Sequence, residues 1–580
     1  MNRSVFNLSH AIAAAACVTL MNGPMAWAQT LLPNVVELTA EQATAGMARG
    51  DFTSQDLTTS FLTRIATYDP TYKAMVSLNP DALAQARASD QRRLAGTPLG
   101  PLDGVPVVVK DNMDYAGLAT TNGFIGFDSR RNGIDIIPGT DSSVVARFKA
   151  AGAVILGKTN LPDFANDGLR TVSSNIGTTL NPYNLNRAPG GSSGGSATAV
   201  SGSFAVLGLG TETGRSIHNP AGFQNLVGVR PTFGRVPIDG IYPLNGSFRD
   251  VAGPLTKTVK DAALTLDVIA GSASRDPLTG GTPPPPAGGF TSQLSGSALQ
   301  GKRIGYFDNG FIPVFSGANN ANVTFRNMDA ATTTLYNNAI DDIRGEGATI
   351  VTDDYLSTNW VNKYRTQPTA PNPFAFDQTQ YLAGLGSGAA FNTIEDFYAQ
   401  SDAQGKPTAA FRAQMQKFVG AAGLTSTTTD PRLSTAGTAW LTWRNELLTE
   451  FINTLDSFNL DGLAFPINGK RAPTLPGIQS VDNPGAIDPN AANNDPLVQG
   501  TVNLLGIPGV ITPAGFYDDN TPFGIIFLGR PWAEAQLLGY AYDYEQATNW
   551  RTAPTLVPEP TTLLAAVGLL FLGTRRRRVA

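Results

Sequence analysis

Residues 190–220 read GGSSGGSATAVSGSFAVLGLGTETGRSIHNP, and this stretch decides the fold. Glycines and hydroxyl side chains crowd both of its ends, as they would in a flexible linker, but a small apolar run, Ser196–Leu209, lies between them. Linkers do not bury apolar segments. We therefore expect a buried helix over Ser196–Leu209 that touches a sheet, with glycine-rich loops on either side.

The sequence around this stretch predicts the sheet and its helices. Two apolar runs, Val105–Val109 and Ala153–Leu156, are typical of buried strands. Strand-turn and then helix patterns return near the C-terminus, at Asn503–Phe516 and Phe523–Asn549. Helical spacing and capping signals, including the capping box Thr39-x-x-Gln42, predict helices that cover Val35–Tyr68 (two helices), about 79–94 and Lys257–Ala270. The Pro/Gly/Ser-rich residues 272–298 are expected to form a surface connector, and 300–465 a region of mixed helices.

Histidine and cysteine are nearly absent. The chain has two histidines, His10 and His218, and one cysteine, Cys17. Ser-His-Asp and Cys-His catalysis need a histidine placed opposite the nucleophile, and zinc sites need several Cys or His ligands. A carboxylate site for Mg²⁺ or Ca²⁺ stays open, although no EF-hand spacing marks one. We expect no metal and no cofactor, and a nucleophilic enzyme made of this chain would take its base from Lys, Asp, Glu, Tyr or a hydroxyl.

Two familiar motifs match by letter but not by context. Gly152–Thr159 (GAVILGKT) fits the phosphate-binding loop, yet its inner residues form an apolar strand pattern that leaves no cradle for phosphate. Gly191–Gly195 (GSSGG) fits the hydrolase elbow G-x-S-x-G, which needs a histidine far downstream, and none follows His218. A net charge of −5 also gives no support for a nucleic-acid partner.

Lys110 ends the predicted strand in the run VVVKDN. A lysine in this position is either a surface side chain whose amine reaches water or a partly desolvated amine. Desolvation disfavours the charged form of lysine and lowers its pKa, which would make the amine a base near neutral pH.

These stretches together resemble the amidase signature family. The resembling segments cover most of residues 35–270 and resume at 500–550; they are LDGVPVVVKDN, GAVILGKTNLPDF, NPYNLNRAPGGSSGGSATAV, GTETGRSIHNPAG, NLLGIPGVITPAGF and PFGIIFLGRP. The resemblance implies one α/β/α catalytic domain over 31–552, with a large mixed sheet covered by helices and with residues 272–298 and 300–465 shaping the substrate cleft.

The resemblance also implies the site. It places the family's lysine at Lys110, its cis-peptide serine at Ser192 and its nucleophile at Ser216, with Ser193 in support. The implied oxyanion hole consists of the backbone N–H groups of the loop around the nucleophile, namely Thr213, Gly214, Arg215 and Ser216. The chemistry is coherent on its own terms, because a serine hydroxyl is a poor nucleophile until a base takes its proton.

Two residues beside Ser216 depart from the family pattern. Arg215 stands where the family usually has a glycine or another small residue, and a left-handed backbone there would cost an arginine about 1–2 kcal/mol. Its guanidinium is also expected to point toward substrate. His218 stands where many members have arginine, and it is expected either to fill a structural polar role or to contact substrate.

Both ends of the chain read as targeting segments. Residues 1–28 resemble a secretory signal peptide, with Arg3, an apolar stretch over Ala11–Leu20 and the cleavage site Ala26-Trp27-Ala28. Residues 557–580 resemble a PEP-CTERM sorting signal, with a Pro-Glu-Pro motif, an apolar segment at 563–573 and the cluster Arg575–Arg578. This tail implies membrane transit, processing by an exosortase and delivery to the surface or matrix of a Gram-negative bacterium; the alternative is a plain membrane anchor.

The sequence thus predicts an exported amidase that acts on a small amide, without nucleic acid. The segment 376–382 (FDQTQYL) faintly resembles a helix of peptide-amidase-like members, which favours peptide or amino-acid amides. The alternatives are an esterase or aryl-acylamidase on the same site, an inactive surface-binding protein that keeps the fold, and a cytoplasmic glutamine-amidotransferase subunit, which the signal peptide disfavours.

Overall fold

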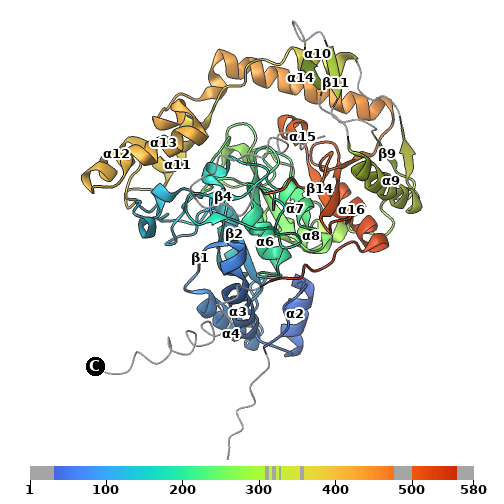
Figure 1. Cartoon of the computed structure of the whole chain (residues 1–580). Helices are drawn as coiled ribbons and strands as arrows, with labels where there is room; N and C mark the ends of the chain where they lie inside the picture. The colour runs from blue at the N-terminus through green and yellow to red at the C-terminus, as the bar shows by residue number, and fades with distance from the viewer. Residues whose placement is uncertain are drawn as a thin grey trace, which may run out of the picture.

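A computed structural model describes residues 32–306, 313–316, 322–325, 328–352, 358–475 and 499–557. Its centre is one mixed sheet of eleven strands (Figure 1). In their order across the sheet the strands are β1 (Met75–Leu78), β3 (Val154–Thr159), β2 (Pro106–Lys110), β6 (Leu207–Glu212), β8 (Val251–Thr256), β7 (Val227–Arg230), β14 (Gly509–Phe516), β15 (Pro522–Leu528), β13 (Gly462–Pro466), β9 (Arg303–Gly305) and β12 (Thr349–Val351).

The sheet mixes parallel and antiparallel pairs. β2 pairs in parallel with both β3 and β6, and β9 does so with β12 and β13, whereas the remaining neighbours are antiparallel. β2 and β6 therefore run side by side, with their carboxyl ends at the same edge. Every residue of both strands is buried. The predicted α/β fold with a large mixed sheet is confirmed.

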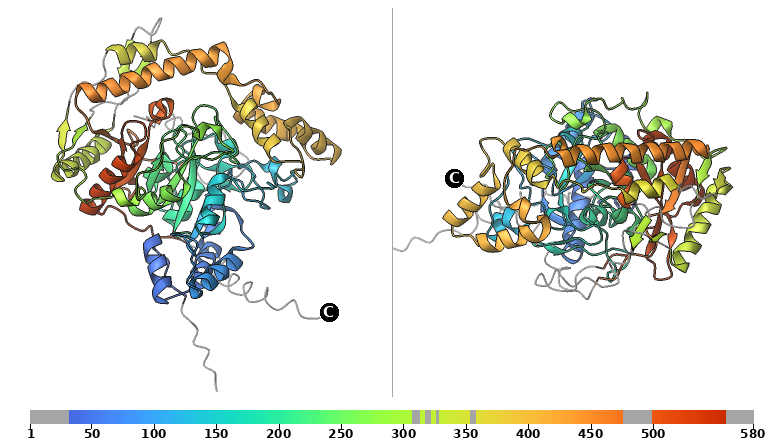
Figure 2. Two further views of the ribbon diagram at one scale, coloured as in Figure 1. Left: turned by 180° about the vertical axis from the view of Figure 1, so that it is seen from behind. Right: turned by 90° about the horizontal axis from the view of Figure 1, so that it is seen from above.

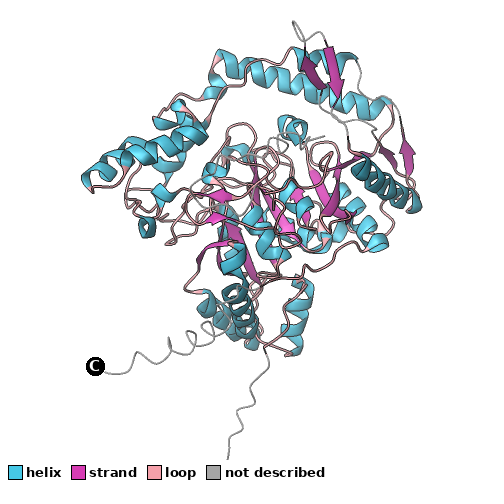
Figure 3. Cartoon of the chain, viewed as in Figure 1, coloured by secondary structure: helices cyan, strands magenta, loops and turns pink. Residues whose placement is uncertain are grey.

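Helices cover the sheet, as Figure 3 shows by colour. α6 packs on β2, β6 and β8, while α7 packs on β7, β14 and β15. The helices of this body are α2 (Ala40–Arg49), α3 (Ser54–Tyr72), α4 (Ala82–Leu94), α5 (Ser143–Ala150), α6 (Gly194–Ser201), α7 (His218–Phe223), α8 (Val259–Ile269), α9 (Ala330–Gly345), α15 (Gln499–Leu505) and α16 (Glu534–Thr548). The predicted capping box at Thr39 and Gln42 is present at the start of α2.

Residues 358–457 form a helical region on the side of the molecule opposite α2, α3 and α4, as the three views agree (Figures 1 and 2). Its helices are α10 (Thr358–Arg365), α11 (Phe374–Gly384), α12 (Ile394–Ala403), α13 (Thr408–Val419) and α14 (Thr435–Ser457). Two small sheets lie outside this region in the sequence. One pairs β10 (Pro313–Ser316) with β11 (Asn322–Phe325), and the other pairs β4 (Val172–Ser173) with β5 (Gly177–Thr178). An aromatic core, which includes Phe124, Phe127 and Phe164 from the body and Phe397 and Phe411 from α12 and α13, joins α11–α13 to the body.

One predicted element is wrong in its second half. We expected a single helix over Ser196–Leu209, but α6 ends at Ser201 and the chain enters β6 at Leu207. Ser203 turns the chain with a left-handed φ of 56°, which a helix does not accept. A short apolar run has no period that separates helix from strand, so the sequence pattern did not reveal this change.

The stretch that matches the phosphate-binding loop is a buried strand. Residues 154–159 form β3 and are buried throughout, as the apolar pattern predicts. Lys158 Nζ lies 3.1 Å from Asp111 Oδ1 and donates to Ala119 O (2.9 Å) and Thr120 Oγ1 (2.8 Å). The lysine is therefore one half of a buried ion pair, and no phosphate cradle surrounds it.

The predicted signal peptide at 1–28 and residues 558–580 of the predicted sorting tail lie outside the described residues. Of the helices that the structure does describe, none combines the length and apolar character needed to span a bilayer.

Replacing Lys158 with methionine (K158M) should lower the free energy of unfolding by about 3–5 kcal/mol, because Asp111 would keep a buried charge without its cation. Urea denaturation of both proteins measures this difference. The matched control is K260M, which breaks the exposed Lys260–Glu41 pair (2.8 Å) and should cost less than about 1 kcal/mol. Equal losses in the two variants would show that the Asp111–Lys158 pair carries no special weight.

Candidate active site

The carboxyl end of β2 carries Lys110 into a buried cluster of hydroxyl groups. The side chain of Lys110 is fully buried. Its Nζ lies 2.7 Å from Ser192 Oγ, 3.0 Å from Ser193 Oγ and 2.8 Å from Thr211 Oγ1. The structure thus brings together three of the residues that the resemblance implies and adds Thr211, which the sequence reasoning missed.

Burial lowers the pKa of Lys110 to about 7, although the negative charges of Asp250 and Glu212 partly oppose the shift. The physical cause is desolvation of the ammonium, which disfavours the charged form. Because no carboxylate forms an ion pair with Lys110 in the described part of the chain, the amine meets only neutral oxygens. The sequence left two readings of Lys110 open, and its burial selects the desolvated amine.

Ser192 and Ser193 lie in the loop that leads into α6. The Gly191–Ser192 peptide bond is cis, as the resemblance implies. Ser193 Oγ donates to Thr211 O (3.1 Å) and accepts from Thr211 N (3.2 Å), so its hydroxyl is tied to the end of β6. It faces Lys110 as an acceptor, consistent with a supporting role.

Ser216 lies between β6 and α7 and is 5% exposed. Its backbone carbonyl accepts from Ser193 N at 3.2 Å, which places the loop of Ser216 directly beside the loop of Ser192 and Ser193. The expected nucleophile and the expected bridging serine therefore stand on adjacent loops, next to the buried lysine.

Glu212, the last residue of β6, anchors the loop of Ser216 by hydrogen bonds. Its Oε2 accepts from the N–H groups of Ile217 (2.8 Å) and His218 (3.0 Å). Asn503 Nδ2 donates to Glu212 Oε1 (3.1 Å) and to Gly214 O (2.7 Å). Burial alone would raise the pKa of Glu212, but the charges and hydrogen bonds of His218 and Arg230 lower this pKa to about 2, so the carboxylate is ionised throughout the neutral range.

Two side-chain contacts fix the loop Thr213–Ser216. Thr213 Oγ1 donates to Asp250 Oδ1 at 2.5 Å, and Asn503 fixes the carbonyl of Gly214. Within the described residues, no hydrogen bond engages the backbone N–H of Gly214 or of Ser216. These two donors are thus available to a ligand oxygen beside Ser216.

Arg215 stands where the family usually has glycine, but its backbone is not left-handed. The left-handed residues of the structure do not include Arg215, so no steric cost of that kind arises. Its side chain runs over Gly168, where an added Cβ would lie 2.4 Å from Arg215 Cγ. Gly168 therefore leaves the room that the arginine fills, and Arg215 remains partly exposed beside the site.

His218 is 1% exposed, and its Nδ1 lies 2.7 Å from Glu212 Oε1. It packs beneath the loop of Ser216 against the carboxylate that anchors this loop. Of the two roles expected for His218, this position favours the structural polar one over a substrate contact.

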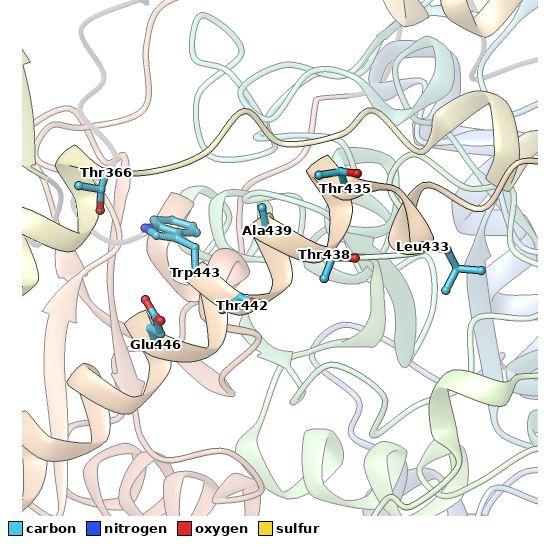
Figure 4. A pocket seen from close by; sticks show the side chains of 8 residues that line it. All are labelled: Thr366, Leu433, Thr435, Thr438, Ala439, Thr442, Trp443 and Glu446. Carbon is cyan, nitrogen blue, oxygen red and sulfur yellow. The ribbon is translucent and has the colours of Figure 1, made fainter.

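One small cavity adjoins the site, and two larger cavities are lined by none of the expected site residues. A small cavity is lined by Asn112, Thr211, Thr213 and Asp250. It shares Ile238, Ile241 and Pro243 with a cavity of about 430 Å³ that extends to Phe376, Asp377, Gln380 and Tyr381 of α11. The third cavity, of about 680 Å³, follows α14 past Thr438, Thr442, Trp443 and Glu446 (Figure 4), and none of the expected site residues lines it.

Several residues of the site carried no recognised signal in the sequence. Lys110 donates to Thr211, which also accepts from Asn112. The loop of Ser216 is anchored by Glu212, which also accepts from Asn503. All four partners are ordinary polar residues. The segment GTETG would have offered Thr211 and Glu212 as candidates, because polar residues at the end of a buried strand need partners. Asn503 lies far along the chain and could be found only from the fold.

Known proteins resemble this chain in sequence and in overall fold. One of the subunits of glutamyl-tRNA(Gln) amidotransferase from Chloroflexus aurantiacus is 34% identical over 535 residues, covering 90% of this chain and 99% of that protein. The solved structure of peptide amidase from Stenotrophomonas maltophilia superposes with a TM-score of 0.72 at 30% identity, covering 90% of this chain and 99% of that one. A bacterial aryl acylamidase shares the fold, with a TM-score of 0.66 at 23% identity.

The family model described as Amidase matches residues 56–538, which span β2, the serine-rich loops, β6 and the first turn of α16. This match covers most of the chain and contains Lys110, Ser192 and Ser216 in the order that the resemblance implies. The chain therefore belongs to the amidase signature family and is a hydrolase that acts on amide bonds.

Proposed function

We propose that this chain is an exported amidase in which Ser216 attacks the amide carbonyl while Ser192 and Lys110 relay its proton. The observation that carries the proposal is the buried Lys110 amine, held by three hydroxyl groups and with its pKa lowered to about 7. A lysine that is neutral near pH 7 has a lone pair with which it can accept a proton.

The hydrogen bonds around Lys110 are compatible with a lone pair that faces Ser192. A neutral amine has two N–H donors and one lone pair. Ser193 Oγ already donates to Thr211 O, so it faces Lys110 as an acceptor, and Thr211 Oγ1 accepts from Asn112 Nδ2 at 3.1 Å. When both N–H groups point to Ser193 and Thr211, the lone pair is left for the hydroxyl proton of Ser192.

The proposed reaction uses these groups in turn. Ser192 passes its proton to Lys110 and takes the proton of Ser216, whose Oγ adds to the carbonyl carbon. The resulting oxyanion is received by backbone N–H groups of the loop Thr213–Ser216, and in other hydrolases the loss of one such donor costs roughly 10²–10³ in rate. The relay returns the proton to the leaving amine, an acyl-enzyme forms on Ser216, and water releases the acid.

The cavity beside α11 supports a peptide or amino-acid amide as the substrate. Its volume of about 430 Å³ is in the range of small-ligand sites, and it shares the wall residues Ile238, Ile241 and Pro243 with the small cavity at Thr211 and Thr213. The similarity to peptide amidase favours the same substrate class. Esters and aryl amides are the alternative substrates of the same serine, and they differ only in the leaving group.

Labelling with a fluorophosphonate probe tests the nucleophile. We expect the wild-type protein to be labelled and the S216A variant not to be labelled, because the probe phosphonylates an activated serine oxygen. The K110A variant should lose labelling and amide hydrolysis by about 10²–10⁴-fold at neutral pH, the range of general acid–base help. Gel fluorescence and ammonia release measure the two effects.

The matched control for S216A is S295A, which replaces an exposed serine in the connector and should label like the wild type. Labelling of S216A at the wild-type level would exclude Ser216 as the nucleophile. Near-normal turnover of K110A would rule out the lysine relay. A panel of amino-acid amides, anilides and matching esters then ranks the substrate classes.

Export is the second part of the proposal, and the two ends of the sequence support it. Residues 1–28 have the basic, apolar and small-residue order of a signal peptide, and residues 557–580 have the tripartite order of a sorting tail. Both segments would direct the catalytic region across the inner membrane, with transit or a transient anchor through the C-terminal segment.

The N-terminus of the protein made by a Gram-negative host tests export. We expect the mature chain to begin at Gln29, because signal peptidase cleaves after a small-x-small motif. N-terminal sequencing of the periplasmic and membrane fractions measures this. An A28R variant should remain unprocessed, and a wild-type chain that keeps Met1 in the cytoplasmic fraction would exclude the export proposal.

A further inference from the structure

Three arginines meet between the sheet and α14. Arg230 ends β7, Arg249 precedes β8 and Arg444 lies on α14. Arg230 is fully buried. The Cζ atoms of Arg249 and Arg444 lie 5.6 and 5.8 Å from the ring of Trp440, and burial together with the positive charges of Arg230 and Arg249 lowers the pKa of Arg444 to about 10.

The guanidinium groups of this cluster keep hydrogen-bond donors without acceptors. Within the described residues, the Arg249 side chain forms no hydrogen bond and no ion pair, and its Nε is buried without a partner. Arg444 makes a single hydrogen bond, from Nη1 to Phe248 O at 3.2 Å. Arg230 Nη2 is also buried without a partner, although the rest of its head group is engaged.

Such an arrangement of like charges is unfavourable. An arginine is charged at neutral pH, and a buried charge without a partner is costly. Trp440 offsets part of this cost, because its ring lies 5.6 Å from the Cζ of Arg249 and 5.8 Å from that of Arg444. A ring contact leaves the N–H donors unfilled, however, whereas a carboxylate would accept from several of them at once.

The cluster adjoins the loop of Ser216 through two contacts. Arg230 Nε donates to Asn503 Oδ1 at 3.1 Å, and Asn503 Nδ2 donates to Gly214 O. Arg249 precedes Asp250, whose carboxyl accepts from Thr213 Oγ1. Asp250 does not neutralise Arg249 by direct pairing, because its oxygens accept from Thr213 and from the backbone N–H groups of Leu244 and Asn245.

We infer that Arg249 and Arg444, backed by Arg230, bind a carboxylate carried by the amide substrate. The inference rests on the proposed function and narrows it: the favoured amides have an anionic group that reaches the arginine cluster while the amide carbonyl lies at Ser216. Arg249 and Arg444 are the partly exposed members of the three. Arg249 makes the main contact, because its donors are uncommitted, whereas Arg444 already donates to Phe248 O. The buried Arg230 lies behind them and pairs with Glu212 at 3.7 Å.

Three amides of similar size test the inference, with ammonia release as the common readout. They are N-acetyl-glutamate α-amide, N-acetyl-norleucine amide and N-acetyl-lysine amide. The wild type should favour the glutamate amide over the norleucine amide by about tenfold or more in kcat/KM and should cleave the lysine amide most slowly. In R249M the rate on the glutamate amide should fall by about 10–100-fold, the usual range for a lost hydrogen bond to a charged group, with the norleucine amide within about twofold.

Two further variants separate a site from a general charge effect. R249K should keep part of the preference, because it retains the charge without the planar fork. R49M, which removes an exposed arginine paired with Asp51, should behave like the wild type. Two results would overturn the inference while the proposed function stands. In one, the wild type hydrolyses the glutamate, norleucine and lysine amides at similar rates. In the other, the wild type prefers the glutamate amide and R249M keeps the same preference.

Direct binding distinguishes the remaining outcomes. Titration calorimetry with glutarate should show binding to the wild type and a loss of at least tenfold in affinity for R249M, whether or not any amide is cleaved. If no amide or ester is hydrolysed, the proposed function fails, and glutarate binding still decides whether the anion site exists. Equal binding of glutarate to both proteins, or binding to neither, would contradict the site.

Discussion

The desolvation of one amine is the constraint on which the structure of the site depends. Lys110 ends β2 inside the sheet, where β3 and β6 flank its strand and its side chain is shielded from solvent. An ammonium ion in such a place is unfavourable, so the pKa falls until the neutral amine is populated near pH 7. The hydroxyls of Ser192, Ser193 and Thr211 satisfy the amine without restoring its charge. A carboxylate in their place would raise the pKa of Lys110. The amine would then be protonated at neutral pH and could not accept a proton.

The second half of the site depends on a carboxylate that is held ionised. Glu212 follows Thr211 on the same strand, yet its environment has the opposite effect on charge: His218, Arg230 and several N–H groups surround it. The end of β6 therefore supplies two groups: the Thr211 hydroxyl, which contacts the Lys110 amine, and the Glu212 carboxylate, which anchors the loop of Ser216. Arg230 pairs with this anion at 3.7 Å and donates to Asn503, so Glu212 also links the loop of Ser216 to the arginine cluster.

Much of this site could be predicted from local sequence, and the remainder required the fold. Lys110 can be recognised as a lysine at the end of an apolar strand. Ser192, Ser193 and Ser216 lie in short motifs that can be recognised without knowledge of the fold. The change from α6 to β6 was missed, because a run of small apolar residues suits both a helix and a strand and only the turn at Ser203 separates them. Asn503 and Arg444 were missed for another reason: their partners lie hundreds of residues away, and no local pattern records such contacts.

The protonation state of Lys110 is the central claim, and NMR measures it directly. Protein labelled with ¹³C at lysine Cε is titrated from pH 5 to 11, and the Lys110 signal is assigned by its loss in K110M. We predict a midpoint near pH 7 and a kcat/KM that rises with the same midpoint, because the neutral amine is the form above its pKa. A Lys110 signal that titrates near 10.4, like an exposed lysine, would contradict the account.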